Sequence, residues 1–454
     1  MMVEQLILCA LIFFGGVTAA ARTAPPGIVL DDETMIDYEL EVATALDQLE
    51  LRCGRFFELK DIDWKKVRKD FEKRAKSIES DGELSATLLE LLARVKDGHA
   101  AVVPLHEGAS LPWPDGYWQE KVGPGFFLCR IGKGVYIKNS WSGSAELGIE
   151  PGMQVLKIDG VAAPKWLDAR REMCAERNSF STEAQADFYA CHWGLAEPAG
   201  TRWKLELEGV DKQKSKRTVT FEKAGVVADG PAFPPQPLEW DGRSLGFGFT
   251  QAGWGYIHMR RIKNTVLDEL DQALGKMRDA PGLILDFRGN SGGGVDHDAF
   301  ESRFIPAGRE MPRMARPPLA GAGPHGYGGP VIVIVDATVR SAGETVAGMF
   351  KEDGRAYMIG ESPTAGMSAQ KETIELPSGK YGLYVAVGSN RISFNGGRGI
   401  EGIGVPPNEI VQYDPQDLNA GRDTLIMRAE ALLAEYPQKE VRYDPEEYEW
   451  VPGE

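Results

Sequence analysis

Two strongly apolar segments constrain the fold of this chain more than any other part of its sequence. GLILDF (residues 282–287) and VIVIVDA (residues 331–337) have the continuous apolar pattern of strands that are buried on both faces. An amphipathic helical pattern precedes the first segment (residues 264–279), and a second helical pattern follows the other (residues 341–354). Because strands and helices alternate, we expect a mostly parallel sheet covered by helices.

Length and composition place the chain among ordinary globular proteins. Its 454 residues suffice for several domains, and 43% of them are hydrophobic, which excludes a disordered or collagen-like protein. The formal net charge is −16. Because an anionic surface repels phosphate backbones, we expect no sequence-nonspecific binding to nucleic acid.

The first residues have the pattern of an export signal. Leu6 to Ala21 is an uncharged stretch of 16 residues that ends in small side chains, which suits a signal peptide and is short for a membrane span. We therefore expect cleavage near Ala21 and export to a periplasm or the extracellular space. Because Glu4 stands where basic residues are usual, an uncleaved signal that anchors the chain is the alternative. No other segment is apolar enough to span a membrane, so we expect no stable span after cleavage.

Helical periodicity precedes a region of short strands and hairpins, and the proline-rich segment 231–237 separates both from the parallel sheet. These patterns predict the following division: a signal peptide at residues 1–21, an N-terminal helical region at 22–112, a β-rich domain at 113–228 with a helical insertion at 164–198, an α/β core at 238–415, and a C-terminal helix and tail at 416–454.

Cysteine and histidine spacings indicate no metal centre. Cys53, Cys129, Cys174 and Cys191 follow the signal without a C-x-x-C pair, and no H-E-x-x-H motif is present. Cys174 and Cys191 flank a polar stretch and are candidates for a disulfide in an exported protein. Four reduced, buried thiols are the alternative.

Two serines stand at predicted strand-to-helix turns, where open α/β sheets place their sites. Ser341 begins a helix, and Glu344, three residues later, makes it a candidate for the N-cap of a capping box. Ser291 lies in GNSGG (residues 289–293), which fits the G-x-S-x-G nucleophile elbow of α/β-hydrolases. The alternative for this loop is a glycine-rich turn whose backbone amides serve as oxyanion donors.

Several blocks follow one another in a specific order: LLELLARVKDGHAAV, VYIKNSWSGSAELGIEPGMQVLKIDGV, GLILDFRGNSGGG, VIVIVDATVRSAGET, IGESPTAG and IEGIGVPPNEIV. This succession resembles the C-terminal processing (tail-specific) serine peptidases, and within them the tricorn-core branch. The resemblance implies an α/β multidomain protein with an N-terminal helical region, a PDZ-like β-rich domain and a peptidase core of the ClpP/crotonase type. It implies no cofactor.

The resemblance also implies roles for particular residues. It makes Ser341 the nucleophile and places the oxyanion hole at the amides of Ala342 and of Gly292 or Gly293. One branch of the family activates its serine with a lysine. The corresponding block here, TAGMSAQ (residues 364–370), lacks that lysine, although Lys371 follows directly.

In the tricorn-like branch, a histidine of a D-x-H element activates the serine, and a glutamate before G-V-x-P supports it. This sequence has both, as His99 and Glu401. An imidazole that titrates near neutral pH suits the removal of a serine proton, and a carboxylate behind it stabilises the imidazolium.

The PDZ-like block implies a way to recruit substrate. Gly123-Pro124-Gly125-Phe126 corresponds to the loop that binds a carboxylate, so Gly123, Gly125 and Phe126 are the candidate substrate-binding residues. Such domains add a peptide to a sheet edge as an extra strand and bind its C-terminal carboxylate on loop amides.

We therefore expect a serine endopeptidase that hydrolyses peptide bonds in unfolded or C-terminally exposed polypeptides. One alternative is a non-catalytic, PDZ-type peptide-binding protein on a peptidase fold, which the missing family lysine favours. Another is an esterase of the α/β-hydrolase type that uses Ser291.

Overall fold

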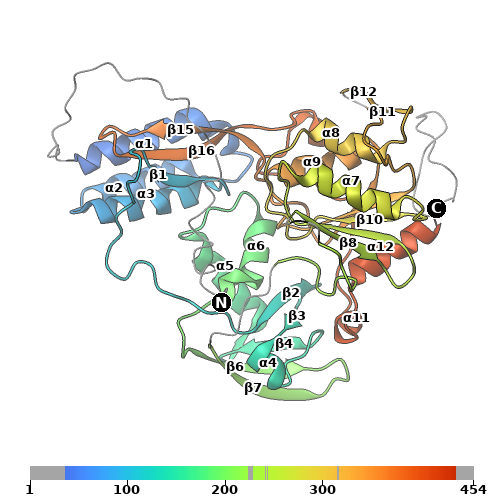
Figure 1. Cartoon of the computed structure of the whole chain (residues 1–454). Helices are drawn as coiled ribbons and strands as arrows, with labels where there is room; N and C mark the ends of the chain where they lie inside the picture. The colour runs from blue at the N-terminus through green and yellow to red at the C-terminus, as the bar shows by residue number, and fades with distance from the viewer. Residues whose placement is uncertain (1–35, 223–228, 241, 243, 314–315, 436–454) are drawn as a thin grey trace. The chain divides into compact units, whose positions relative to one another are not determined.

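The computed structural model describes residues 36–222, 229–240, 242, 244–313 and 316–435 (Figure 1). The predicted signal peptide at residues 1–21 lies outside these residues. Within the described part of the chain, no helix has the length and apolar character that crossing a membrane requires.

The predicted parallel sheet is present in the second half of the chain. Its six strands lie in the order β17-β14-β13-β10-β9-β8, and all neighbours are parallel except the edge pair β8 and β9. The strands are β8 (Leu245–Phe249), β9 (Gly255–Met259), β10 (Leu283–Asp286), β13 (Val331–Val335), β14 (Tyr357–Gly360) and β17 (Glu409–Ile410).

Helices cover both faces of this sheet, which explains why its central strands are apolar throughout. Alternate side chains of β10 and β13 pack on one face against α7 (Val266–Met277) and α9 (Ala342–Glu352). The side chains between them pack on the other face against α12 (Thr424–Glu435).

The N-terminal helices expected from sequence are also present, as α1 (Tyr38–Cys53), α2 (Trp64–Ala75) and α3 (Asp81–Val95). Each begins after a residue whose side chain accepts a hydrogen bond from the first turn: Asp37, Asp63 and Ser80.

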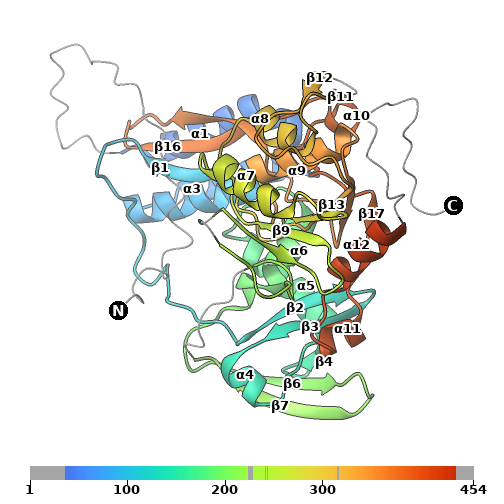
Figure 2. The same cartoon turned by 45° about the vertical axis from the view of Figure 1, so that its right-hand side comes forward.

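These helices pack beside a separate three-stranded sheet in the order β1-β16-β15. β1 (Ala101–Pro104) follows the helices, whereas β15 (Ala369–Glu375) and β16 (Tyr381–Ser389) come from the second half of the chain. Figure 2 shows β1 and β16 next to each other, beside α1 and α3. The helical region therefore shares a sheet with residues from the predicted core.

The β-rich region forms an antiparallel sheet in the order β2-β3-β4-β6-β7, with the short β5 paired to β4. The strands are β2 (Phe126–Ile131), β3 (Gly134–Ser140), β4 (Gln154–Ile158), β5 (Val161–Ala162), β6 (Arg202–Glu208) and β7 (Lys214–Thr220). The predicted helical segment at 164–198 contains α5 (Ala163–Ala175) and α6 (Glu183–Cys191). The remaining short elements are α4 (Ser142–Glu146), α8 (His297–Glu301), α10 (Phe394–Gly397), α11 (Pro415–Asn419), β11 (Glu310–Arg313) and β12 (Arg316–Ala320).

The disulfide considered between Cys174 and Cys191 is absent. Both cysteines are free and buried, as are Cys53 and Cys129. Cys191 packs in the core of the β-rich sheet, whereas Cys174 belongs to a separate apolar cluster beside Phe180. The alternative of four buried thiols is therefore the one that the structure shows.

A buried ionic cluster joins the end of β10 to the start of α12. The Arg288 guanidinium contacts Asp286 at 2.6 Å and Asp423 at 3.0 Å, and all three side chains are fully buried or nearly so. Tyr256 donates a hydrogen bond to Asp286, and Tyr413 accepts one from Arg288. The cluster therefore fixes α12 against the sheet.

We expect Arg288→Met to lower the free energy of unfolding by about 3–5 kcal/mol, because it leaves two buried carboxylates without their cation. Arg422→Met is the control, since the Arg422 side chain is 55% exposed and its pair with Asp417 is worth about 0–1 kcal/mol. Unfolding in urea measures both variants. Equal losses in the two variants would contradict the structural role of the cluster.

Candidate active site

Ser341 lies in a sharp turn between β13 and α9. It is the N-cap of α9, and its N–H donates to Glu344 Oε2 at 3.1 Å, as the capping-box interpretation predicts. An N-cap normally has an extended backbone. Ser341 instead has φ 56° and ψ −126°, a conformation that costs about 1–3 kcal/mol in a residue with a side chain. Such strain persists where surrounding contacts impose it, and it is concentrated at functional sites.

Glu344 supplies those contacts. Its carboxyl group is fully buried, and one oxygen accepts hydrogen bonds from Thr364 Oγ1 and the Gly366 N–H, each at 2.6 Å. The other oxygen accepts from the Met367 N–H at 2.9 Å as well as from Ser341. Burial raises the pKa of Glu344 to about 8, although these hydrogen bonds oppose the shift. One carboxyl group thus holds the Ser341 turn against the segment 364–367.

The glycine loop after β10 lies directly against Ser341. A Cβ added to Gly292 would stand 2.8 Å from the Ser341 Cβ. The Gly292 N–H is already bonded to Asn290 Oδ1 at 2.8 Å, whereas no hydrogen bond among the described residues uses the Gly293 N–H. Ala342 is the first residue of α9, so its N–H has no acceptor within the helix. The loop and helix therefore leave two amides available next to Ser341.

His99 follows α3 and is held by the residues around it. Asp97 accepts the His99 N–H on one oxygen and the Ala386 N–H of β16 on the other. Burial, together with the positive charges of Lys371, Arg340 and Lys60, lowers the pKa of His99 to about 3. The imidazole is therefore neutral at pH 7. The preceding residue, Gly98, lies against the side chain of Met367, whose N–H donates to Glu344.

Glu401 lies in the same buried cluster as His99. Its Oε1 accepts the Lys60 ammonium at 2.8 Å and the Ser181 hydroxyl at 3.2 Å. Burial raises the pKa of Glu401 to about 7, although Lys60 lowers it. Ligand atoms of Asp97, His99 and Glu401 all lie within 4.8 Å of one another.

Two buried atoms in this cluster lack hydrogen-bond partners among the described residues: His99 Nδ1 and Glu401 Oε2. Unpartnered polar atoms are costly inside a protein, so each requires an explanation. A hydrogen bond from the imidazole to this carboxylate would satisfy both.

The cluster does not have the character of a metal site, although it contains one histidine and two carboxyl groups. Both Asp97 oxygens accept backbone N–H groups, and the Lys60 ammonium contacts Glu401. The charges of Lys60 and Lys371 oppose a further cation here. The donor set therefore does not favour a divalent ion.

Lys60 and Ser181 are site residues that sequence reasoning missed. The Lys60 side chain is only 1% exposed, and it also donates to the Lys96 carbonyl at 2.7 Å. Ser181 lies between α5 and α6, and its hydroxyl accepts the Gly98 N–H at 2.9 Å. Neither belongs to a recognisable motif, because each reaches the cluster through tertiary packing alone.

Residues 253–411 match the model of the family described as peptidase family S41. This match covers 159 of the 454 residues. The chain is 25% identical over 219 residues to a carboxyl-terminal-processing protease of Picosynechococcus sp., which covers 44% of this chain and 48% of that protein. It is 26% identical over 202 residues to a putative tricorn protease homolog 2 of Streptomyces coelicolor, over 44% of this chain and 17% of that protein.

The match thus spans about half of the first relative and a sixth of the second. The structure of mature CPAF superposes with a TM-score of 0.62 at 13% identity, over 87% of this chain and 98% of that one. This likeness shows a shared mixed α/β fold with a helical N-terminal region. The resemblance expected from the sequence is confirmed as a similarity to peptidase family S41, to a C-terminal processing protease and to a tricorn protease homolog.

The remaining predicted site residues, Ser291, Gly123, Gly125 and Phe126, form no hydrogen bond with the His99 cluster among the described residues. The Ser291 hydroxyl is buried and has no hydrogen-bond partner within the described part of the chain. Gly125 has φ +83°, and its carbonyl accepts the Trp141 N–H at 2.8 Å. Gly123 lies two residues before it. Phe126 is the first residue of the edge strand β2, and its side chain packs in the core of the β-rich sheet.

Two neighbouring glycines of the loop after β10 differ in the space around them, and this difference can be tested. A Cβ on Gly293 would stand 1.7 Å from the Ile262 carbonyl oxygen, whereas one on Gly294 meets nothing within 4 Å. We expect Gly293→Ala to lower the free energy of unfolding by about 1–3 kcal/mol, because the loop must move. Gly294→Ala should change it by less than about 0.5 kcal/mol. Thermal unfolding compares the two, and equal stability would show that the loop is not confined as described.

Proposed function

We propose that the protein is a serine endopeptidase in which Ser341 is the nucleophile, His99 the base and Glu401 the group that orients His99. The main support is that His99 and Glu401, 302 positions apart in the sequence, meet in one buried cluster. This cluster is linked to the strained Ser341 turn, because the Gly402 N–H donates to the carbonyl of Gly366, whose own N–H donates to Glu344. S41 is a family of serine peptidases, so this arrangement has a matching chemistry.

The proposed reaction begins with neutral His99. Its Nε2 takes the proton of the Ser341 hydroxyl as the oxygen attacks the peptide carbonyl carbon. The same proton then passes to the leaving amine, and the C–N bond breaks to leave an acyl-enzyme. Water, deprotonated in turn by His99, hydrolyses the ester and restores the serine.

Glu401 supports this base. A hydrogen bond from His99 Nδ1 to the unpartnered Oε2 fixes the tautomer whose Nε2 accepts a proton. The carboxylate also stabilises the imidazolium that forms when His99 takes the proton. Lys371 carries a positive charge near His99 and is not needed as the base.

The oxyanion hole is formed by the Ala342 and Gly293 amides. Of the two glycines considered, Gly293 is the better donor, because the Gly292 N–H is bonded to Asn290. Each preorganised donor typically contributes about 10²- to 10³-fold to the rate.

The β-rich region is proposed as a PDZ-like domain that recruits unfolded or C-terminally exposed polypeptides. Its strand β2 is at the edge of the sheet, where a peptide can add as a further strand. The backbone of Gly123, Gly125 and Phe126 would receive the terminal carboxylate. The division into domains and export of the chain by its first 21 residues are part of the same proposal.

Cleavage of an unfolded protein with a free C-terminus, followed by mass spectrometry, tests this function. We expect Ser341→Ala and His99→Ala each to lower the rate at least about 10³-fold, whereas Ser291→Ala keeps most of it. Loss of activity in Ser291→Ala alone would support the esterase-type alternative. Binding without cleavage by the wild type would support a non-catalytic peptide-binding protein.

The pH dependence tests the role of Glu401. Because this carboxyl group has a pKa of about 7, it becomes protonated as the pH falls, and kcat/KM should decrease below that pH. Lys60 lowers the pKa of Glu401, and Asp97 raises it. Lys60→Met should therefore move the acid limb of the profile to higher pH.

Lys65→Met is the matched control, since Lys65 is exposed on α2 and should leave the profile unchanged. The acid limb of the kcat/KM profile should disappear in Glu401→Gln, because the glutamine amide does not titrate. An acid limb at the wild-type pH in both Lys60→Met and Glu401→Gln would refute the assignment.

A further inference from the structure

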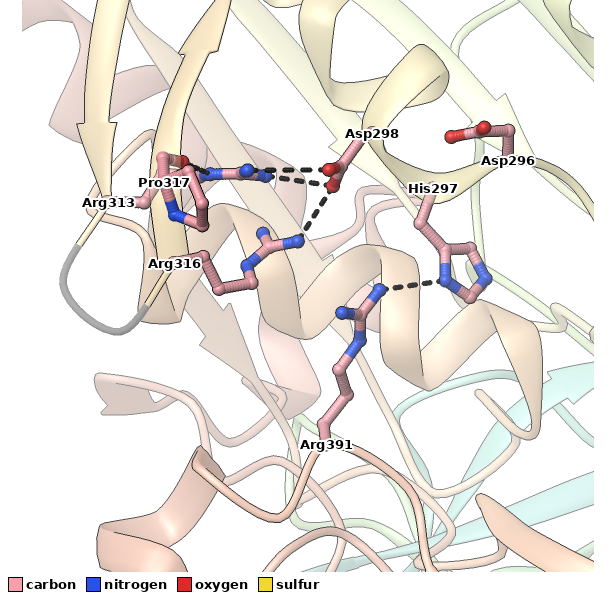
Figure 3. A pocket seen from close by; sticks show the side chains of 7 residues that line it. All are labelled: Asp296, His297, Asp298, Arg313, Arg316, Pro317 and Arg391. Atoms are coloured by element: carbon pink, nitrogen blue, oxygen red, sulfur yellow. Dashed lines mark hydrogen bonds and ion pairs between the residues drawn. The ribbon is translucent and has the colours of Figure 1, made fainter.

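An arginine-rich cavity lies outside the catalytic cluster. Its volume is about 510 Å³, and its charged lining comes from the start of α8, the β11–β12 hairpin and the loop after β16. Figure 3 shows the side chains that surround it: Asp296, His297, Asp298, Arg313, Arg316 and Arg391. Its size is within the range of ligand pockets, which is roughly 300–1,000 Å³.

Two of the three arginines are neutralised by carboxyl groups of the protein. Arg313 contacts Asp298 through two nitrogens, at 2.8 and 3.3 Å. Arg316 contacts Asp298 at 2.7 Å and also pairs with Glu301 and Asp353. These pairs build the wall of the cavity and leave little charge for a ligand.

Arg391 differs from both, because no carboxyl group of the described residues forms an ion pair with it. Its Nη2 contacts His297 Nδ1 at 2.9 Å and the Met349 sulfur at 3.3 Å. Burial and the nearby Arg391 lower the pKa of His297 to about 4, so the imidazole is neutral at pH 7 and accepts this hydrogen bond. His297 thus orients the guanidinium without balancing its charge (Figure 3).

A partly buried guanidinium without a counter-charge is suited to bind a carboxylate. Arginine keeps its proton at any physiological pH and presents paired N–H donors that match the two carboxylate oxygens. Burial and the adjacent cation Arg316 lower the pKa of Arg391, although the more distant charges of Asp298, Asp353 and Glu301 oppose the shift.

The contact between Arg391 and Met349 relates the cavity to Ser341, because Met349 and Ser341 lie on the same helix. Met349 follows Ser341 by eight residues on α9, and this separation spans about 12 Å along a helix. An extended peptide advances by about 3.3 Å per residue. Three or four residues of an extended peptide therefore span the same length as the helix between Ser341 and Met349.

We propose that this cavity binds the carboxylate side chain of an Asp or Glu in the polypeptide substrate, about three or four residues from the scissile bond, through Arg391. The inference rests on the proposed peptidase function and adds a sequence preference to it.

Pairs of peptide substrates test this preference. The two members of a pair are identical except that one carries Glu where the other carries Gln. This position is varied over the four residues on each side of the cleaved bond. We expect wild type to favour Glu at one position three or four residues from the bond by about 10-fold in kcat/KM, the effect of one charged hydrogen-bond pair. In Arg391→Gln the Glu/Gln ratio should fall to about one, and Arg391→Lys should retain part of it.

Arg398→Gln is the control, because Arg398 is an exposed arginine near the same loop, and its ratio should stay at the wild-type value. A ratio near one at every position in wild type, or a ratio unchanged by Arg391→Gln, would overturn the proposal while leaving peptidase activity established.

Binding separates failure of this proposal from failure of the proposed function. Fluorescence anisotropy with the same labelled peptides, measured on Ser341→Ala, needs no catalysis. We expect tighter binding of the Glu peptide, lost when Arg391→Gln is added. If the wild type cleaves no peptide but this difference remains, the peptidase proposal fails and the carboxylate site stands. Equal binding of Glu and Gln peptides would overturn the site.

Discussion

The antiparallel pairing of β1 with β16 is the interaction on which the candidate site depends. It aligns Ala101 with Tyr384 and thereby joins the end of the helical region to a hairpin from the second half of the chain. Asp97 extends the connection, because its carboxylate accepts N–H groups from both His99 and Ala386. At the end of β16, the Ser389 hydroxyl accepts the Glu401 N–H. One strand therefore carries the restraints on both members of the His99–Glu401 pair.

Burial sets the pKa values of His99 and Glu401. Removal from water disfavours the charged form of each group, so the imidazole is neutral and the carboxyl group titrates near 7. Lys60 supplies the positive charge that pairs with Glu401, and it lies in the turn between α1 and α2. The helical region is thus part of the catalytic arrangement that we propose, rather than a separate module.

The α5–α6 connection contacts the same cluster. The Ser181 hydroxyl contacts Glu401 and the Gly98 N–H, and the Thr182 hydroxyl donates to the Ala365 carbonyl at 3.0 Å. These contacts link the β-rich region to the two segments that hold His99 and the Ser341 turn. If that region binds peptides as proposed, its helices are placed to influence the geometry of the cluster.

The sequence alone determined the elements whose signals are local. The parallel strands, the amphipathic helices and the strand-to-helix turn at Ser341 follow from hydrophobic periodicity and glycine placement, which act over a few residues. The motifs around His99 and Glu401 could be matched to a family for the same reason.

Only the tertiary structure decided which of these residues meet and what charges surround them. Lys60, Ser181 and Arg391 carry no motif, because their roles depend on long-range packing and on the presence or absence of a counter-charge. The choice of Gly293 over Gly292 depends on one hydrogen bond to Asn290. Burial and long-range pairing are properties of the folded chain, and no short stretch of sequence encodes them.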